Sequence, residues 1–375
     1  DDVCESECQE DATQGRGAIE AAHLMGLNAS CIGNHEFDYG PGGEGSDPLR
    51  GALEEMALLA DFAWLTANVY ERGPEGVRGP RWSPSGIAPW ALVERAGIRV
   101  GLIGLSTTET PQTTLYRHVA DLEFGDVVEA VREAESALRA EGAEVIIVMG
   151  HLTGTCRLSD YETRDQPCEV GGEIGQLLNE LPRGTIDLLV VGHEHTVTFN
   201  RVEDTFILES GSQGRFLSRV DLVVGPEGVD VEASEVSPPW PIRHARVDPG
   251  CDGGAFPLEA IDVGGVRLTP DSRALALIRR LENEAGSLCD PLGCSDHHLT
   301  RSRSAESAVG NFAAEAMLSA FPEADLALTN SGGLRNDIPA GVVRREHIRA
   351  VMPFENRLVL VEMTGSALEL LLRIG

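Results

Sequence analysis

Gly33-Asn34-His35-Glu36-Phe37-Asp38-Tyr39-Gly40 is the segment around which the rest of the sequence can be organised. It follows a short apolar run at residues 29–32, which is typical of a buried strand. The strand is expected to end in amide, imidazole and carboxylate groups, which are common ligands of divalent metals. In open α/β sheets, ligands bind beyond the carboxyl ends of the strands. The segment therefore predicts a polar site at the edge of a sheet.

Two further apolar runs also end in histidine. Residues 144–149 lead into Gly150-His151, and residues 186–191 lead into Gly192-His193-Glu194-His195. A single histidine in such a place is more simply a core or loop residue, but three strands that each deliver one favour a metal site. Asn34, His151 and His193 are therefore candidate ligands, with His195 on the same loop. This nitrogen and oxygen set suits Zn, Mn, Fe or Ni alike.

His35 is expected to have a different role from the metal ligands. Asp38 stands three residues later, close enough to accept a hydrogen bond from the imidazole and fix its tautomer. A histidine oriented in this way beside a metal site can donate a proton or stabilise charge. The simpler alternative is that Asp38 caps its own backbone, and the two interpretations are compatible.

Composition limits the classes of partner. The 375 residues are enough for two domains, and 60 acidic residues against 30 Lys and Arg give a net charge of −30. Nucleic-acid binding needs a basic face, so nucleic acid is excluded as an expected partner. No apolar run is long enough for a transmembrane segment. An anionic substrate would have to be captured locally, by metals and a few arginines.

The eight cysteines favour an oxidising compartment. Three close pairs lie in polar, loop-like sequence and are spaced for small disulfide loops rather than for one zinc site. Cys31 lies in a predicted strand and is expected to be a small buried hydrophobe. The predicted pairs are Cys4/Cys8, Cys156/Cys168 and Cys289/Cys294.

The order of elements predicts an α/β protein with two domains. Strand and helix patterns alternate up to His195, and short alternating strands at 205–209, 215–224 and 229–233 predict a second, more antiparallel sheet. Residues 234–270 are rich in Pro and Gly, as in a linker. We expect a catalytic domain at 1–240, a linker and interdomain helix at 241–287, and a second domain at 288–375.

The second domain carries two segments that could hold a flat ligand. Asn330-Ser331-Gly332-Gly333-Leu334-Arg335 is a glycine-rich turn expected after a strand at 325–329, and its arginine supplies a planar cation. Pro353-Phe354-Glu355-Asn356 precedes another expected strand, at 357–362, and offers an aromatic face with an amide. Each segment alone is weak evidence, since Phe354 could be plain core.

Together these segments resemble the 5′-nucleotidase family of two-domain metallophosphoesterases. The resemblance implies a four-layer αββα catalytic domain with two divalent metal ions (Zn, Mn or similar), joined by a helix to an α/β substrate-binding domain. It also implies release of phosphate from nucleoside 5′-phosphates by a hydroxide that the metals position. The matching segments are 33–38, 150–151, 192–195, 303–311, 330–335 and 353–356.

The resemblance also implies a role for each matched residue. Asn34, His151 and His193 would bind one metal and His195 the other, while His35 with Asp38 would act in catalysis. Arginines would contact the phosphate or carboxylate groups of the substrate, and the other matched residues would line the nucleoside pocket. The implied substrate-binding residues are Arg303, Asn330, Gly332, Gly333, Arg335, Phe354 and Asn356.

The chain departs from the family pattern at both ends. The Asp-x-His strand that opens the pattern is absent, and Asp2, 32 residues before Asn34, is favoured over Asp1 as the bridging metal ligand. The second aromatic clamp of the family would lie beyond Gly375. We therefore interpret the chain as a fragment lacking both ends, of which the second domain is truncated.

Several alternatives remain open on the same scaffold. They are a 2′,3′-cyclic nucleotide phosphodiesterase, a nucleotide-sugar pyrophosphatase, a thiosulfohydrolase and, outside the enzymes, an inactive surface binding module. Phe354 and Asn356 favour a nucleotide as the small-molecule partner. The expected location is periplasmic or extracellular, and the expected state is a monomer or weak dimer.

Overall fold

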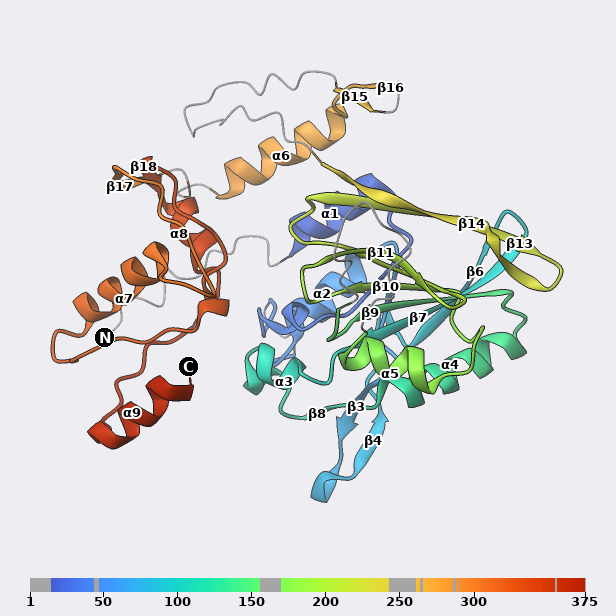
Figure 1. Ribbon diagram of the computed structural model, residues 1–375, viewed down its shortest axis with the longest axis horizontal. Helices are drawn as coiled ribbons and strands as arrows, with labels where there is room; N and C mark the ends of the chain where they lie inside the picture. The colour runs from blue at the N-terminus through green and yellow to red at the C-terminus, as the bar shows by residue number, and fades with distance from the viewer. Residues whose placement is uncertain are drawn as a thin grey trace. The chain divides into compact units, whose positions relative to one another are not determined.

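The computed structural model describes residues 15–43, 47–155, 170–242, 261–263, 266–285, 288, 290–354 and 356–374. The chain divides into two compact units (Figure 1). The first contains Asp1–Arg246 and Leu258–Leu281, and the second contains Val247–Pro257 and Glu282–Gly375. The domain boundaries expected at 240 and 287 stay a prediction. Among the described residues, no helix is long and apolar enough to cross a membrane.

A six-stranded sheet forms the centre of the first unit, in the order β11-β12-β10-β9-β7-β6. The inner strands β7, β9, β10 and β12 run parallel, and β6 and β11 are antiparallel at the edges. Ser106 pairs with His151 and His151 pairs with Gly192, so β7, β9 and β10 end at one level. The strands are β6 (Trp90–Arg95), β7 (Ile98–Ser106), β9 (Val145–His151), β10 (Leu188–Gly192), β11 (Val197–Val202) and β12 (Thr205–Ser210).

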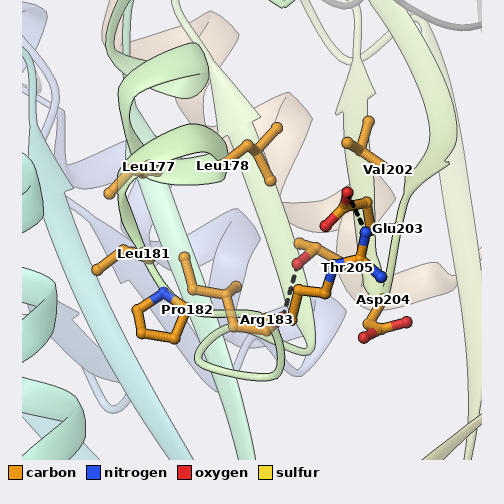
Figure 2. Close-up of a pocket in the computed structure, with 10 residues that line it drawn as sticks. Leu177, Leu178, Leu181, Pro182, Arg183, Val202, Glu203, Asp204 and Thr205 are labelled. Carbon is orange, nitrogen blue, oxygen red and sulfur yellow. Dashed lines mark hydrogen bonds and ion pairs between the residues drawn. The ribbon is translucent and has the colours of Figure 1, made fainter.

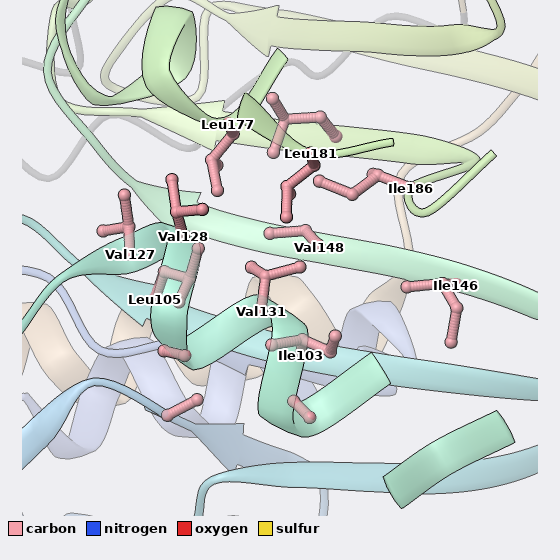
Figure 3. Close-up of a cluster of buried hydrophobic side chains, with 14 of the residues drawn as sticks. Ile103, Leu105, Val127, Val128, Val131, Ile146, Val148, Leu177, Leu181 and Ile186 are labelled. Carbon is pink, nitrogen blue, oxygen red and sulfur yellow. The ribbon is translucent and has the colours of Figure 1, made fainter. Parts of the chain in front are cut away.

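Helices α4 (Val127–Ala140) and α5 (Gly172–Glu180) cover one face of this sheet (Figure 1). Helix α4 begins after Asp126, whose side chain caps it by accepting a hydrogen bond of 2.7 Å from the Glu129 N–H. Side chains of both helices interlock with Ile103, Ile146 and Val148 of the strands (Figure 3). This buried cluster fixes the strands whose ends carry the candidate site residues.

A smaller parallel sheet of β1 (Ala29–Cys31), β2 (Ala63–Leu65) and β5 (Ile87–Ala88) packs with α1 (Arg16–Met25) and α2 (Gly51–Leu59) around a second core. The Ala67 N–H donates to the Gly104 carbonyl at 2.7 Å and thereby links this sheet to β7. A Cβ at Gly104 would lie 2.2 Å from the Leu65 carbonyl oxygen, so this close approach requires glycine.

The antiparallel region after His195 differs in part from the prediction. Strands β13 (Phe216–Gly225) and β14 (Gly228–Pro241) form a separate hairpin, as expected. Residues 205–209, however, belong to β12 of the main sheet, because β12 pairs in parallel with β10. Side chains of the hairpin pack on the face of the main sheet that carries Leu188, Phe206 and Leu208.

Shorter elements complete the first unit, and α6, which lies within the predicted linker stretch 241–287, belongs to it as far as Leu281. Strands β3, β4 and β8 form a small antiparallel sheet, and β15 pairs with β16. These elements are η1 (His35–Phe37), β3 (Val69–Arg72), η2 (Pro74–Gly76), β4 (Arg78–Arg81), α3 (Thr110–Thr113), η3 (Tyr116–His118), β8 (Leu122–Phe124), β15 (Ile261–Val263), β16 (Val266–Leu268) and α6 (Ser272–Ala285).

The second unit has a small core around α7, in which Val309, Leu334 and Val351 are buried. The strands predicted at 325–329 and 357–362 are not formed. Their apolar alternation was misleading, because no neighbouring strand of the described residues pairs with them and Val359 and Val361 are exposed. The elements are β17 (Pro291–Ser295), α7 (Ala308–Ala320), η5 (Ser331–Gly333), β18 (Gly341–Arg344), α8 (Arg345–Val351) and α9 (Gly365–Ile374).

Candidate active site

Loops that follow β1, β9 and β10 converge in the first unit. A Cβ built on Gly33 would lie 2.8 Å from both Cγ and Nδ1 of His151, so only glycine fits where the β1 loop passes this imidazole. The His151 and His193 rings are 4.9 Å apart at 67°, an edge-to-face arrangement. Since Asn34 directly follows Gly33, the structure brings the loops of Asn34, His151 and His193 together.

Asn34 presents a buried amide oxygen that no donor of the described part of the chain reaches. The residue is 2% exposed, and its Nδ2 donates to the Thr113 carbonyl oxygen at 2.9 Å. Because this bond uses the NH₂ group, Oδ1 is the side-chain atom that is left to accept, and no donor among the described residues reaches it. A buried acceptor without a donor costs free energy, so it needs a cation or water. Asn34 therefore fits the role of a metal ligand.

His151 is held in the neutral form that a metal ligand requires. Burial, followed by the nearby imidazoles of His193, His35 and His195, lowers the pKa of His151 from 6.5 to about 3. A neutral imidazole keeps a lone pair for a cation. His151 thus lies within electrostatic range of the other three imidazoles.

The His193–His195 loop is locally strained. His193 has a φ of 106° and His195 a φ of 60°, both in the region that side chains other than glycine avoid. Buried Glu209 on β12 supports the loop by accepting hydrogen bonds from the N–H and hydroxyl of Thr196. Burial raises the pKa of Glu209. The loop leaves His193 half-buried and His195 exposed, so the two imidazoles occupy different environments.

His35 and Asp38 form the pair that the sequence predicted. His35 Nδ1 lies 2.7 Å from Asp38 Oδ2, and the Thr114 hydroxyl donates to Asp38 Oδ1 at 2.7 Å. Asp38 thus accepts on both oxygens and holds the ring with a hydrogen on Nδ1. The segment after α3 also supports this loop through His118 Nδ1, 2.7 Å from the Phe37 carbonyl oxygen.

The described residues provide part of a metal-ligand set. Within them, no group of three or more His, Cys, Asp or Glu side chains is arranged to hold a metal ion. Asp2, the predicted bridging ligand, lies outside the described residues. What the structure does bring together is an amide oxygen and imidazoles, which are suitable donors for a borderline divalent ion.

The candidate binding residues of the second unit are only partly assembled. The Arg335 guanidinium carbon lies 5.5 Å from the centre of the Phe354 ring, and Arg335 Nη1 donates to the Gly332 carbonyl oxygen at 3.2 Å. A Cβ at Gly333 would lie 2.9 Å from Asn330 Oδ1. These five residues therefore form one cluster, made of the turn and Phe354.

Two other candidates of the second unit stand apart from this cluster's side-chain contacts. Asn356 joins Phe354 through a backbone hydrogen bond of 2.9 Å and is exposed. Arg303 is also exposed, and among the described contacts none joins it to the cluster.

A separate pocket lies at the opposite end of the main sheet. Ile186 and Thr205 line it just before β10 and at the start of β12, whereas His193 follows the other end of β10. Figure 2 shows Arg183 reaching Glu203 across its rim, at 2.5 Å. The pocket therefore contains none of the predicted site residues.

The described cysteines, Cys31 and Cys294, are not candidate site residues. Burial raises the pKa of the Cys31 thiol from 9.0 to about 12, so this thiol is inert at neutral pH. Cys294 is exposed and free, and Cys289 lies outside the described residues, so their predicted disulfide has no support. The pairs Cys4/Cys8 and Cys156/Cys168 lie outside the described residues.

Sequence reasoning missed the polar residues that support these loops. Glu173, Thr114 and Glu209 each hold a site loop through hydrogen bonds. One signal was present for Glu173: it stands four residues before Leu177 on the apolar stripe of α5, where a charge is unusual. No comparable signal marks Thr114.

Known proteins share this architecture and sequence. Residues 285–374 match the family described as 5'-nucleotidase, C-terminal domain. A cell wall protein of Listeria monocytogenes is 27% identical over 94% of this chain and 45% of its own length. A probable 5'-nucleotidase of Treponema pallidum is 26% identical over 95% of this chain and 62% of its own length. The chain thus spans about half to two thirds of these relatives.

Solved structures agree at the level of the fold. A 5'-nucleotidase precursor of Thermus thermophilus has a TM-score of 0.67 at 21% identity, and covers 92% of this chain and 62% of its own. A sulfate thiohydrolase, SoxB, from the same genus has a TM-score of 0.66 at 19% identity, covering 91% of this chain and 53% of its own. The predicted α/β fold is confirmed. The chain is therefore similar to 5'-nucleotidases in sequence and fold, and its residues 285–374 match the C-terminal domain of that family.

Proposed function

We propose that this chain belongs to a metal-dependent phosphoric ester hydrolase that releases phosphate from nucleoside 5′-phosphates. The observation that carries the proposal is the buried Oδ1 of Asn34, which no donor among the described residues reaches, on the β1 loop that passes the paired rings of His151 and His193. A cation bound in this arrangement would offset the free-energy cost of burying the amide oxygen. The match of residues 285–374 to the 5'-nucleotidase C-terminal domain supports a nucleotide as the substrate.

The proposed ligands divide between two divalent ions. Asn34, His151 and His193 would hold one ion and His195 the other, and Asp2, which lies outside the described residues, is the remaining proposed ligand. When bound, such ions polarise the phosphoryl group and lower the pKa of water to make a nucleophile at neutral pH. The chain itself keeps His151 neutral by burial and fixes the His193 loop through Glu209.

His35 and Asp38 form the proposed catalytic pair. The Asp38 carboxylate holds a hydrogen on Nδ1, so His35 acts on the substrate through Nε2. When the ring also carries a proton on Nε2, it can donate a hydrogen bond to a phosphoryl oxygen or pass that proton to the leaving oxygen, and Asp38 stabilises this imidazolium form. Thr114 keeps Asp38 in place for this role.

The second unit supplies the proposed nucleoside site. Phe354 offers a flat apolar face for a base, and Arg335, already stacked near it, offers a cation for an anionic group. Asn330, Gly332 and Gly333 complete the turn that carries Arg335. Arg303 and Asn356 are exposed and can reach a ligand.

A secreted location follows as part of the proposal. The relative from Listeria monocytogenes is called a cell wall protein, and an acidic, cysteine-containing chain is compatible with a periplasmic or extracellular compartment.

Phosphate release from a substrate panel tests the function. After chelation, we would add Mn, Zn or Co to the protein with 5′-AMP, 2′,3′-cyclic AMP, UDP-glucose or bis-p-nitrophenyl phosphate. We expect metal-dependent release, fastest from 5′-AMP, and its loss in His193→Ala. The matched control is His297→Ala, a surface histidine of the second unit. Equal activity of wild type and His193→Ala would contradict the proposal.

One alternative function has specific structural support. The sulfate thiohydrolase resembles this chain as closely as the 5'-nucleotidase precursor does, with TM-scores of 0.66 and 0.67. The fold therefore does not separate the two reactions, whereas the stacked Arg335–Phe354 pair favours a nucleoside. Faster release of sulfate from a thiosulfonate ester than of phosphate from 5′-AMP would reverse this preference.

A further inference from the structure

We propose that Glu173 is a positioning residue for the metal site, a role that rests on the proposed function. Its carboxylate lies between the loops after β7 and β9 and hydrogen-bonds to both. One loop continues from His151, and the other leads to the residue that holds the Asn34 side chain. A single buried side chain thereby positions two predicted metal ligands, Asn34 and His151, which come from different strands.

The contacts of Glu173 divide evenly between the two loops. Its Oε1 accepts hydrogen bonds from the N–H and hydroxyl of Thr108, both at 2.7 Å. Its Oε2 accepts from the N–H of Thr153 at 2.9 Å and from the Thr153 hydroxyl at 3.2 Å. Glu173 is only 5% exposed, so these bonds replace its hydration.

The hydrogen bonds from Glu173 to Thr153 hold the chain just after His151. Thr153 is two residues beyond His151, and the intervening Leu152 donates its N–H to the Gly192 carbonyl at 3.2 Å. Thr153 also receives hydrogen bonds from the start of α5, because its carbonyl oxygen accepts from Ile174 N–H at 3.1 Å. The β9 loop is therefore joined to α5 on one side and to the end of β10 on the other.

The loop that contains Thr108 is connected to the Asn34 side chain through α3. Thr107, next to Thr108, accepts at its carbonyl oxygen from the Thr110 hydroxyl at 2.7 Å and from the Thr110 N–H at 3.1 Å, and Thr110 is the first residue of α3. At the other end of α3, the Thr113 carbonyl oxygen accepts from Asn34 Nδ2 at 2.9 Å. This last bond orients the Asn34 side chain and leaves Oδ1 as the atom available to a metal ion.

The chemistry of the side chain explains why an acid occupies this position. Two loops present four donors, and a carboxylate has two oxygens that can each accept more than one hydrogen bond. A glutamine would have to turn its NH₂ group toward one pair of donors. Among the described residues, no basic side chain forms an ion pair with Glu173, so the buried carboxylate depends on these loop donors alone.

The test compares Glu173→Gln with Glu180→Gln, the same substitution on the exposed end of α5. Mn²⁺ and Zn²⁺ affinity would be measured by competition with a chelator, well below the unfolding temperatures of both variants. Loss of a supporting hydrogen bond behind metal ligands typically weakens metal binding by about 10- to 100-fold. We expect a loss in this range for Glu173→Gln and no change for Glu180→Gln.

Hydrogen exchange supplies a readout that does not depend on metal or activity. The amide protons of Thr108 and Thr153 are expected to exchange faster in Glu173→Gln, with no comparable change in Glu180→Gln. Faster exchange with wild-type metal affinity would mean that the carboxylate only stabilises the fold, and would overturn the positioning role. Unchanged exchange would overturn the proposed contacts themselves.

A second variant keeps the test decisive if Glu173→Gln fails to fold. Thr108→Val removes only one hydroxyl donor and retains the backbone one, so a smaller loss of metal affinity is expected. An unchanged affinity counts against the role.

The outcomes also separate the two proposals. A wild-type chain that binds metal but releases no phosphate contradicts the proposed function and leaves this role standing, whereas one that binds no metal overturns both.

Discussion

The two units of the chain prepare their candidate residues to very different degrees. In the first unit, Asn34 and His151 follow strands of buried sheets, and the surrounding polar groups hold their loops. In the second unit, the core is small and Asn330 and Arg303 are exposed. The difference teaches that the part expected to act on the phosphoryl group is preorganised by packing. The part expected to recognise the rest of the substrate presents its side chains to solvent.

The largest effect expected from this contrast is on catalytic rate. His35→Ala should lower kcat by about 10²- to 10⁴-fold, because a positioned proton donor or charge stabiliser is lost. The metal affinity should remain that of the wild type, since His35 is not a proposed ligand. Steady-state kinetics with 5′-AMP and a chelator competition would measure the two quantities. Unchanged turnover in His35→Ala would remove the catalytic role of the His35–Asp38 pair.

A smaller effect, and one on a different parameter, is expected in the second unit. Phe354→Ala should raise KM for 5′-AMP by about 10-fold, since loss of one stacking face costs about 1 kcal/mol or slightly more, while kcat changes little. Phe312→Ala is the matched control, because Phe312 is an exposed phenylalanine on α7 of the same unit. A fall in kcat with constant KM would mean that the two units do not divide the work in this way.

The smallest effect concerns the scaffold behind the His35 loop. Arg50 is 6% exposed, donates to Asp121 at 2.6 Å and also to the His118 carbonyl at 2.8 Å. The hydrogen bond from Arg50 lowers the pKa of Asp121 below 3.8. Since the folded state prefers the ionised carboxylate, its stabilisation is complete above pH 3.8 and is lost as the pH falls through the lowered pKa.

Asp121→Asn should therefore reduce the free energy of unfolding at pH 7 by about 1 kcal/mol, a modest value because Asp121 is half-exposed. The difference from wild type should shrink as the pH falls below 3.8. Denaturant titrations at several pH values would measure it, with the exposed Asp296→Asn as the control. A difference that grows in acid would contradict the assigned direction of the pKa shift.

The sequence predicted those parts of the site that depend on local pattern. The apolar runs before Asn34, His151 and His193 identified strands whose ends and following loops approach one another. The polar supports could not be found in this way. Glu173 gains its role only because loops from two strands approach it, a consequence of tertiary packing. The strand expected at 357–362 failed for the same reason, since a strand needs a partner that its own sequence does not specify.

The central claim is that Asn34, His151 and His193 share a divalent metal. Anomalous diffraction from crystals grown with Zn²⁺ or Mn²⁺, recorded at the metal absorption edge, tests it most directly. The account predicts a peak within about 2.0–2.2 Å of Asn34 Oδ1 and of one ring nitrogen each of His151 and His193. A fully loaded crystal with no peak between these three side chains would contradict it.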